Sequence, residues 1–291
     1  MRLSKGERIF SVFNNAFMAF STILCAAPML YIIMASFISP DDYMSYGISF
    51  PRHFSLYNYI YLIGGKSKVA NGLMINIYVT AVATALNLVF TYVCAYVISK
   101  RYLPGRVGLT FFMYFTMLFG GGIVPYYLWI KSLGLLNSLW SIILPGLISP
   151  WNCFLIRNFL MTLPESIEES ARIDGANDIV ILGKIILPLS TPVLATIGLF
   201  IAVNSWNGWF TALIYFNDSS LYPLQLVLRY FLANNVLPVT AEEARLRAMV
   251  EAPGDILKMT ATVIAIFPIL VVYPFVQKYF VKGIIAGSIK G

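Results

Sequence analysis

Charged side chains are scarce in this chain. Asp, Glu, Lys and Arg together supply 11% of its 291 residues, and histidine occurs once. Hydrophobic residues reach 59%, whereas soluble globular domains contain roughly 45–50% apolar residues. The sequence has no basic stripe interleaved with aromatic residues, so its pI of about 9.2 does not indicate nucleic-acid binding. The composition excludes an ordinary soluble domain and places the chain in a membrane.

The sequence also lacks a recognisable metal or nucleotide site. His53, the single histidine, has no second ligand at the spacing that a metal needs, so we expect it to be a surface residue. The string from Gly64 to Ser67 resembles the end of a phosphate-binding loop. However, the pattern requires a glycine five positions before Gly65, and that residue is Ile60. We therefore expect no metal, no cofactor and no ATPase activity in this chain.

The chain does contain apolar runs of helical length. About 20 apolar residues span the hydrocarbon core as a helix, because a helix satisfies its own backbone hydrogen bonds there. We therefore predict an all-α membrane protein with six transmembrane helices. Six runs contain no Asp, Glu, Lys, Arg or His: 17–37, 72–98, 109–130, 135–156, 189–216 and 259–276.

Lys and Arg are spread unevenly over the connections between these runs. With a cytoplasmic N-terminus, the inner segments hold twelve of the twenty, and the outer segments hold eight. Cytoplasmic segments retain Lys and Arg, and the shortest inner loop alone contains Lys100, Arg101 and Arg106. We therefore predict that both termini are cytoplasmic.

The outer loop 217–258 carries a charged stretch in which Thr240 is followed by Glu243, a pair that fits a helix capping box. We expect a short solvated helix there.

The predicted topology divides the chain into three regions. Residues 1–71 hold the N-terminal cytoplasmic segment, the first transmembrane helix and an outer loop. Residues 72–280 hold the core with a cytoplasmic hairpin at 162–188, and residues 281–291 form a cytoplasmic tail.

The third run is interrupted by Gly120, Gly121, Gly122 and Pro125, which together weaken and kink a helix. Irregular backbone at membrane depth is tolerated where it is buried in protein or lines an aqueous cavity. The interruption therefore indicates either a helix that borders a translocation path or glycines that let two helices pack closely. Both interpretations remain open.

The fifth run contains Asn204, Trp206, Asn207 and Trp209 within six residues. Aromatic rings stack on the apolar faces of sugars while amides bond to their hydroxyl groups, so this composition suits a carbohydrate path. The same residues also serve as interfacial anchors or as interhelical hydrogen-bond partners. These four residues, together with Gly121 and Pro125, are our candidates for the substrate path.

Five of the thirteen acidic residues lie between Glu165 and Asp178. Pro164 suits a first helical turn, and Gly175 ends that helix because glycine reaches the left-handed conformation without strain. Asn177 or Asp178 then caps a second helix, which Pro188 terminates or kinks. The pattern predicts two short helices joined by a turn, projecting into the cytoplasm.

The predicted hairpin combines acidic residues with small apolar patches. This combination suits docking into a groove on another protein. An amphipathic helix lying on the membrane is the alternative, but it prefers Lys and Arg on its polar face, whereas acids dominate here. The apolar residues are Ile167, Ala171, Ile173, Ile179 and Leu182.

The hairpin resembles the coupling-loop signature of permease subunits of binding-protein-dependent ABC importers, in which Glu-Ala-Ala is followed by Gly and by Ile-x-Leu-Pro. Ser170 replaces the first Ala, and it is small enough for the same close packing. The strings EESARIDGAND, LPLSTPVLA and QKYFVKGIIAGSIKG, with Trp206-Asn207, are similar to the carbohydrate-uptake branch, in particular the smaller maltose-type permease. MLFGGGIVPYYLWIKSLGLLNS and LYPLQLVLR narrow the resemblance to the complex oligosaccharide or polysaccharide group. The matching positions are Glu169, Ser170, Ala171, Gly175, Ile185, Leu187 and Pro188.

The resemblance implies a type I ABC importer fold in a bacterial cytoplasmic membrane and a subunit without catalytic chemistry. The implied partners are a second, different permease subunit, two ATPase subunits that bind ATP and Mg, and an external solute-binding protein. The turn around Gly175 would seat in a cleft of one ATPase, with Glu169 and Asp174 nearest its surface, and the tail 281–291 would also reach the ATPase pair. The implied coupling residues are Glu168, Glu169, Ser170, Ala171, Asp174, Gly175, Ala176, Ile185, Leu187 and Pro188.

The residues also bear on the energy source. Proton-driven carriers need an ionisable relay inside the membrane, and six uncharged runs supply none. ATP-driven alternating access with an oligosaccharide as cargo is our prediction. A sodium-coupled secondary transporter remains the alternative, because carbonyls and hydroxyls alone can bind sodium.

Overall fold

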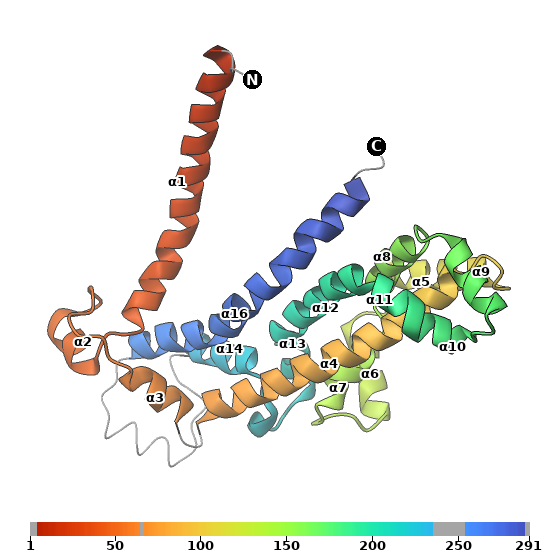
Figure 1. The fold of residues 1–291 in the computed structure, drawn as a ribbon. Coiled ribbons are helices and arrows are strands. Elements are labelled where there is room, and N and C mark those ends of the chain that lie inside the picture. The colour runs from red at the N-terminus through yellow and green to blue at the C-terminus, as the bar shows by residue number, and fades with distance from the viewer. Residues whose placement is uncertain (1–4, 65–66, 235–253, 289–291) are drawn as a thin grey trace. The chain divides into compact units, whose positions relative to one another are not determined.

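The structure is a computed structural model that describes residues 5–64, 67–234 and 254–288. Every regular element in these ranges is a helix (Figure 1). The chain divides into two compact units, one containing 1–70 and 228–267, the other 71–227 and 268–291. The capping box of Thr240 and Glu243 lies outside the described residues.

In the first unit, α1 ends in a buried polar cluster. The backbone oxygen of Ser36 accepts hydrogen bonds from Asn58 Nδ2 at 3.3 Å and from Thr260 Oγ1 at 3.2 Å, and all three residues are buried. The bonds fix the end of α1 between two other helices. The helices that lie wholly in this unit are α1 (Lys5–Ala35), α2 (Pro40–Tyr46) and α3 (Tyr57–Ile63).

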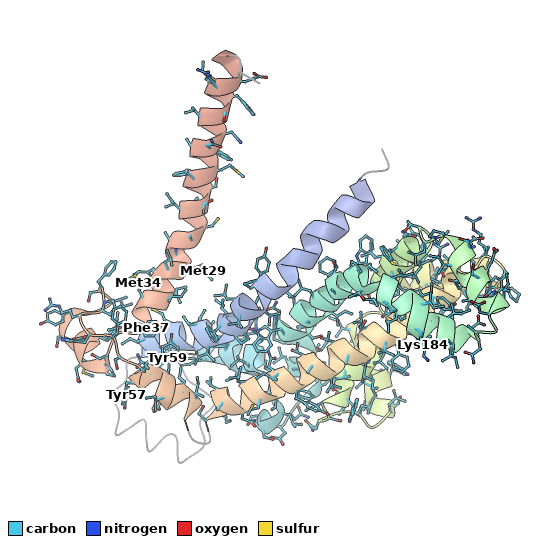
Figure 2. All side chains as sticks on the ribbon, in the orientation of Figure 1. Met29, Met34, Phe37, Tyr57, Tyr59 and Lys184 are labelled. Carbon is cyan, nitrogen blue, oxygen red and sulfur yellow. The ribbon has the colours of Figure 1, made fainter. Side chains whose placement is uncertain are left out.

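The rest of α1 contacts little of the chain. Its most apolar 18-residue window is 0% buried, and its side chains radiate on all sides (Figure 2). At its base, the ring centroids of Phe37 and Tyr59 lie 5.2 Å apart. Both residues are labelled in Figure 2. His53 is exposed, as predicted, and its Nδ1 lies 3.8 Å from Asp42 Oδ2. An apolar helix with this exposure is suited to lipid or to a partner subunit rather than to water.

The second unit is built on α4 and on helices that are short or bent. The helices between the second and fifth apolar runs are α4 (Lys68–Ser99), α5 (Arg106–Leu118), α6 (Ile123–Ser132), α7 (Trp140–Ile143), η1 (Leu144–Gly146), α8 (Pro150–Leu160) and α9 (Glu165–Ile173). They are followed by α10 (Asp178–Val180), η2 (Ile181–Ile186), α11 (Leu187–Leu189), α12 (Thr191–Trp206), α13 (Phe210–Tyr215) and η3 (Ser219–Leu221). Two further helices, α14 (Leu224–Asn234) and α16 (Gly254–Ser288), cross the division between the units.

Three of the described helices are long and apolar enough to cross a membrane alone, and two bent pairs raise the count to five. The single helices correspond to the predicted runs 17–37, 72–98 and 259–276. The predicted run 135–156 does not form one helix. It contains α7, η1 and α8, because Pro145 and Gly146 interrupt the regular backbone hydrogen bonding and Pro150 begins a new helix.

The glycine-rich interruption is a complete break rather than a kink. Helix α5 ends at Leu118, α6 begins at Ile123, and their axes differ by 115°. Gly122 has φ +83°, a conformation that favours glycine. Pro125 lies in the first turn of α6, where proline fits a helix, so the glycines alone cause the break.

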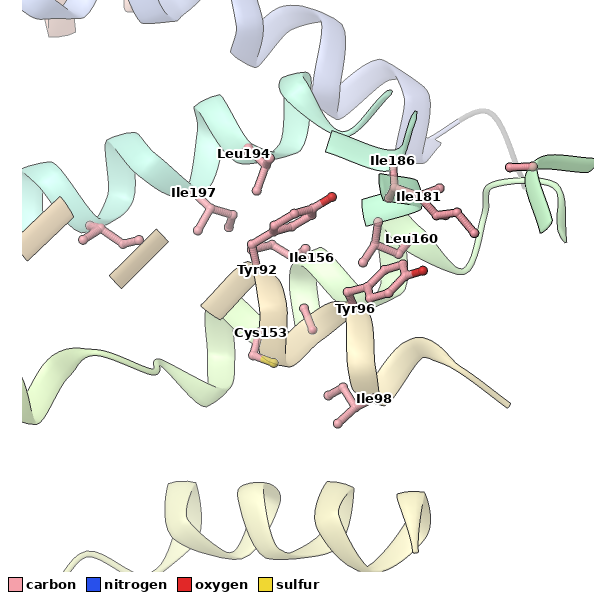
Figure 3. Packing of buried hydrophobic residues seen from close by; sticks show 13 residues of the cluster. Tyr92, Tyr96, Ile98, Cys153, Ile156, Leu160, Ile181, Ile186, Leu194 and Ile197 are labelled. Carbon is pink, nitrogen blue, oxygen red and sulfur yellow. The ribbon is translucent and has the colours of Figure 1, made fainter. Parts of the chain in front are cut away.

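The main hydrophobic core of the second unit lies where α4, α8, η2 and α12 meet (Figure 3). Tyr92 and Tyr96 of α4 pack with Cys153 and Ile156 of α8 in this cluster. The hairpin contributes Ile181 and Ile186, which are almost completely buried. The second arm of the hairpin is therefore part of the core.

Candidate coupling hairpin and cavity

The predicted hairpin at 162–188 is present, and local hydrogen bonds explain its turn. Gly175 has φ +86°. The Ala176 N–H donates to the Ala171 oxygen at 2.9 Å, and the Gly175 N–H donates to the Arg172 oxygen at 3.0 Å. These two bonds form a Schellman motif, which satisfies carbonyl groups at the end of α9.

The second arm begins with a side-chain cap. The Val180 N–H donates to Asn177 Oδ1 at 2.9 Å, so Asn177 is the capping residue of the predicted pair. The arm continues as the π-helical segment η2 and then α11, which contains Pro188. Helix α12 follows after a bend of 83°, which confirms the break predicted near Pro188.

The hairpin presents only part of its apolar surface to the outside. Ile173 is 87% exposed and Ile179 is 81% exposed, on either side of the Gly175 turn. Ala171 is buried in the core cluster, and Ile167 and Leu182 are half-buried. The exposed apolar patch is therefore smaller than the five residues predicted, and it is centred on the turn.

The other predicted coupling residues divide in the same way. Ala176 and Ile185 are half-buried and pack against the core cluster. Glu169, Ser170, Asp174, Leu187 and Pro188 are exposed. Exposed carboxylates thus flank the exposed isoleucines at the tip of the hairpin.

Glu168 is the exception among the predicted acidic contacts, because it is held within the chain. Lys100 Nζ donates to both carboxylate oxygens of Glu168, and the two side chains are 13% and 20% exposed. Sequence reasoning did not find this pair. The cations of the 100–106 loop and the acids of the hairpin were both placed on the cytoplasmic side, and their opposite charge was the available signal.

Arg172 also joins the hairpin to that loop. One of its guanidinium nitrogens donates to the Tyr102 hydroxyl oxygen at 2.7 Å and to Asp178 Oδ1 at 2.9 Å. These hydrogen bonds, with Tyr102 first, raise the pKa of Arg172 above its usual value. The guanidinium therefore stays charged at every physiological pH and bridges both arms of the hairpin to the loop.

A cavity of about 680 Å³ with both polar and apolar lining residues lies against the part of α4 from Asn76 to Asn87. Among its described lining residues, every side chain is uncharged. Such a lining is suited to a ligand that offers hydroxyl groups and apolar faces. The polar and aromatic lining residues are Asn76, Asn87, Tyr126, Ser141, Ser149, Trp151, Asn152, Phe200, Asn204, Ser205, Thr211 and Tyr215.

The residues predicted for a substrate path are not all in this cavity. Asn204 lines it. Trp206 is buried, and Trp209 is half-buried with its ring edge-on to Phe210 at 5.5 Å. Trp206 and Asn207 line a second, largely apolar hollow of about 1060 Å³, which Asn204 also borders. The Asn207 amide donates to the Val203 oxygen at 2.9 Å.

The glycine-rich break lies beside the cavity residue Tyr126. Gly121 and Pro125 are exposed and do not line the cavity, whereas the neighbouring Tyr126 does. Asn76 and Asn87 were not predicted as cavity residues, although they are isolated amides in an apolar run. They lie eleven residues apart, which is about three helical turns. That spacing places both on one face of α4 and was a usable signal.

Comparison with known proteins decides the family. A family model described as the binding-protein-dependent transport system inner membrane component matches residues 2–286. The chain belongs to this family. It is therefore a multi-pass component of the cytoplasmic membrane, as predicted.

Two relatives from Bacillus subtilis (strain 168) match nearly the whole chain. The polygalacturonan/rhamnogalacturonan transport system permease protein YtcP is 40% identical over 286 residues, covering 98% of this chain and 99% of the relative. Protein LplC is 42% identical over 292 residues, covering 100% of this chain and 98% of the relative. These relatives confirm the resemblance seen in the coupling signature.

A solved structure shows the same fold. It is the crystal structure of a bacterial ABC transporter involved in the import of the acidic polysaccharide alginate, with 31% identity and a TM-score of 0.88 over 96% of this chain and 99% of the matched chain. The fold is therefore that of a type I ABC permease. None of these relatives supports the sodium-coupled alternative.

Proposed function

We propose that this chain is one permease subunit of an ATP-driven importer whose cargo is an oligosaccharide derived from a complex polysaccharide. The proposal draws its cargo class from relatives that transport polygalacturonan, rhamnogalacturonan and arabinooligosaccharides by name. The partners are a second, different permease subunit, two ATPase subunits and an external solute-binding protein. ATP and Mg bind to the ATPases, and this subunit performs no covalent chemistry.

The observation that carries the proposal is the arrangement of the cavity and the hairpin along one helix. Asn76 and Asn87 of α4 line the cavity. Further along the same helix, Tyr92 and Tyr96 pack against the second arm of the hairpin. Figure 1 shows α9 and α10 beyond the C-terminal end of α4. A rigid helix that contacts both sites can transmit movement between them.

The tip of the hairpin is the part that docks. Ile173 and Ile179 offer apolar surface, and Glu169 and Asp174 surround it with negative charge. Ser170, Gly175 and Ala176 keep the turn small. Glu168, Ala171, Ile185, Leu187 and Pro188 hold the hairpin in place relative to the core and α12. ATP binding would close the ATPase pair and move the hairpin as a lever.

The transport cycle is alternating access across six membrane crossings with cytoplasmic termini. The crossings are α1, α4, the α5–α6 pair, the segment α7 to α8, the segment α12 to α13, and α16. Hairpin movement shifts the population between inward-open and outward-open states only if the ATPase holds the hairpin differently in its two states. The broken helices are consistent with this cycle, because broken helices commonly border translocation paths.

The cavity supplies the half of the path that this subunit contributes. Amides of Asn152 and Asn204 are placed to bond sugar hydroxyls, and the ring of Trp151, which is 61% exposed, is placed to stack on a sugar face. No side chain among the described lining residues is charged, so the amides and hydroxyls of the lining are suited to sugar hydroxyl groups. These residues should therefore bind neutral and acidic oligosaccharides with similar affinity.

The test is substrate-stimulated ATPase activity and uptake by the complex in proteoliposomes. Gly175→Val forces a β-branched residue into a left-handed conformation, so stimulation and uptake should collapse while the subunits still co-purify. Gly175→Asn is the matched control, because asparagine tolerates that conformation, and it should retain most activity. Uptake by the wild-type chain without any ATPase would refute the proposal.

A further inference from the structure

The two arms of the hairpin are attached to the rest of the chain by different forces. The second arm is held by the core cluster through Ile181 and Ile186. The first arm, α9, has only one buried residue, Ala171. Its remaining attachment to α4 is made by ionic and hydrogen-bonding contacts with residues that directly follow that helix.

The principal contact is between Lys100 and Glu168. Both side chains are mostly shielded from water, so their attraction is screened less than that of a surface pair. The Lys100 ammonium also lies 3.9 Å from the centroid of the Tyr96 ring, within the range of a cation–π interaction. Lys100 is therefore fixed on two sides, by the hairpin and by the last turn of α4.

A second contact reinforces the first. Arg172, near the end of α9, donates to the Tyr102 hydroxyl oxygen at 2.7 Å. Its guanidinium carbon lies 5.2 Å from the centroid of the same ring. Arg172 therefore joins α9 to Tyr102, which lies two residues after Lys100, by a hydrogen bond and by a cation–π contact.

We infer that Lys100 is a positioning residue that ties α9 to α4, so that movement of the docked hairpin reaches the cavity wall. Asn76 lies 24 residues before Lys100, about 36 Å away along a helical axis. Without the tie, α9 would swing about the Gly175 turn while α4 stayed in place. The inference rests on the proposed function, because it assigns a coupling role within that transport cycle.

The test measures the number of substrate molecules taken up per ATP hydrolysed by the reconstituted complex. Lys100→Glu and Glu168→Lys each place like charges together and should lower this ratio roughly ten-fold, within the usual range of coupling between sites. The exchange Lys100→Glu with Glu168→Lys restores the pair and should recover most of the ratio. Crosslinking from Asp174→Cys to the ATPase should persist in all variants.

The neighbouring pair of Arg101 and Glu165 is the matched control. Its atoms are 3.6 Å apart, and both side chains are 73% exposed, so it contributes little. The exchange Arg101→Glu with Glu165→Arg should leave uptake per ATP unchanged. An equal loss in this control would overturn the inference, since it would show that any change of charge in the loop has the same effect.

A merely structural role predicts a different result. If Lys100→Glu lowers the unfolding temperature while uptake per ATP stays at the wild-type value, the inference is wrong. If that variant does not fold, Glu168→Gln decides, because it removes the carboxylate charge that faces Lys100 without bringing like charges together: a several-fold lower ratio supports the tie, and an unchanged ratio overturns it. Failure of the proposed function would look different again, as a wild-type complex without ATPase-dependent uptake.

Discussion

Asn76 donates a hydrogen bond from its side-chain amide to the backbone oxygen of Trp206, with 3.1 Å between the nitrogen and the oxygen. Trp206 is the last residue of α12, where the predicted fifth run breaks before α13. Asn87 similarly donates to the Gly146 oxygen at the end of η1. A carbonyl without a partner is costly in an apolar interior, so these two amides of α4 stabilise two helix breaks.

Asn76→Leu should therefore lower the stability of the folded chain. The substitution leaves the Trp206 oxygen without its donor and should cost about 1–3 kcal/mol, the usual penalty for a buried unsatisfied group. Thermal unfolding of the purified subunit in detergent measures the effect. Asn207→Leu is the comparison, because its exposed amide bonds only within α12, and it should change the unfolding temperature much less.

Gly72→Ala should also be destabilising, for a steric reason. A Cβ at Gly72 would lie 3.2 Å from backbone atoms of Leu224 and from the Tyr222 oxygen, so the backbone would have to move. We expect a loss of about 1–3 kcal/mol, as for other overpacked sites. Gly198→Ala is the control, since its Cβ would make only an ordinary 3.6 Å contact with Leu88 and alanine is the better helix former. Equal unfolding temperatures for the two variants would contradict the prediction.

The parts of the fold that sequence reasoning predicted are those that local chemistry determines. Gly175 and Asn177 act on hydrogen bonds within a few residues of themselves, so the turn and the second helix start were predictable. The break at 120–122 was predictable for the same reason. The location of the Lys100–Glu168 pair was not, because it depends on how residues 68 positions apart in sequence are brought together.

The predicted span 135–156 illustrates a second limit. Hydropathy reports that a segment is apolar but not whether its backbone is continuous, and proline is tolerated within membrane helices when neighbours satisfy the freed groups. Pro145 and Pro150 therefore did not distinguish a kinked span from the three short elements found there. The lining of the cavity was missed for a related reason, since it comes from this broken segment, from α4, and from α12 and α13.

Trp151→Ala should weaken transport without preventing assembly. The ring is a cavity wall that is 61% exposed, so its loss removes a stacking surface rather than a core contact. We expect the substrate concentration for half-maximal uptake to rise up to about ten-fold, since an aromatic contact contributes about 0.5–1.5 kcal/mol. Trp140→Ala is the control, because Trp140 is 41% exposed and lies outside the cavity lining. It should leave the substrate concentration for half-maximal uptake unchanged.

The charge of the cargo can be examined with the same assay. Because the described cavity lining is uncharged, Asn204→Ala should reduce uptake of oligogalacturonate and of a neutral oligosaccharide of equal length by the same factor. A loss confined to the acidic sugar would show that Asn204 contacts the carboxylate, and our assignment of hydroxyl recognition to this cavity would then be wrong.

The two isoleucines at the tip of the hairpin provide the most direct examination of docking. Ile173 and Ile179 make few contacts within the chain, so Ile173→Ser and Ile179→Ser should leave the unfolding temperature of the isolated subunit nearly unchanged. Fully burying such a side chain at an interface is worth about 1.5–3 kcal/mol, so each substitution should weaken ATPase binding by about ten-fold or more. Titration of the ATPase against the subunit in nanodiscs measures this binding.

Ile186→Ser is the control and should have the opposite effect. Ile186 is only 1% exposed, so its substitution should lower the unfolding temperature of the subunit itself. If the serine variants at the tip bind the ATPase as tightly as the wild type, the exposed isoleucines face lipid or solvent, and the docking surface must lie elsewhere on the cytoplasmic side.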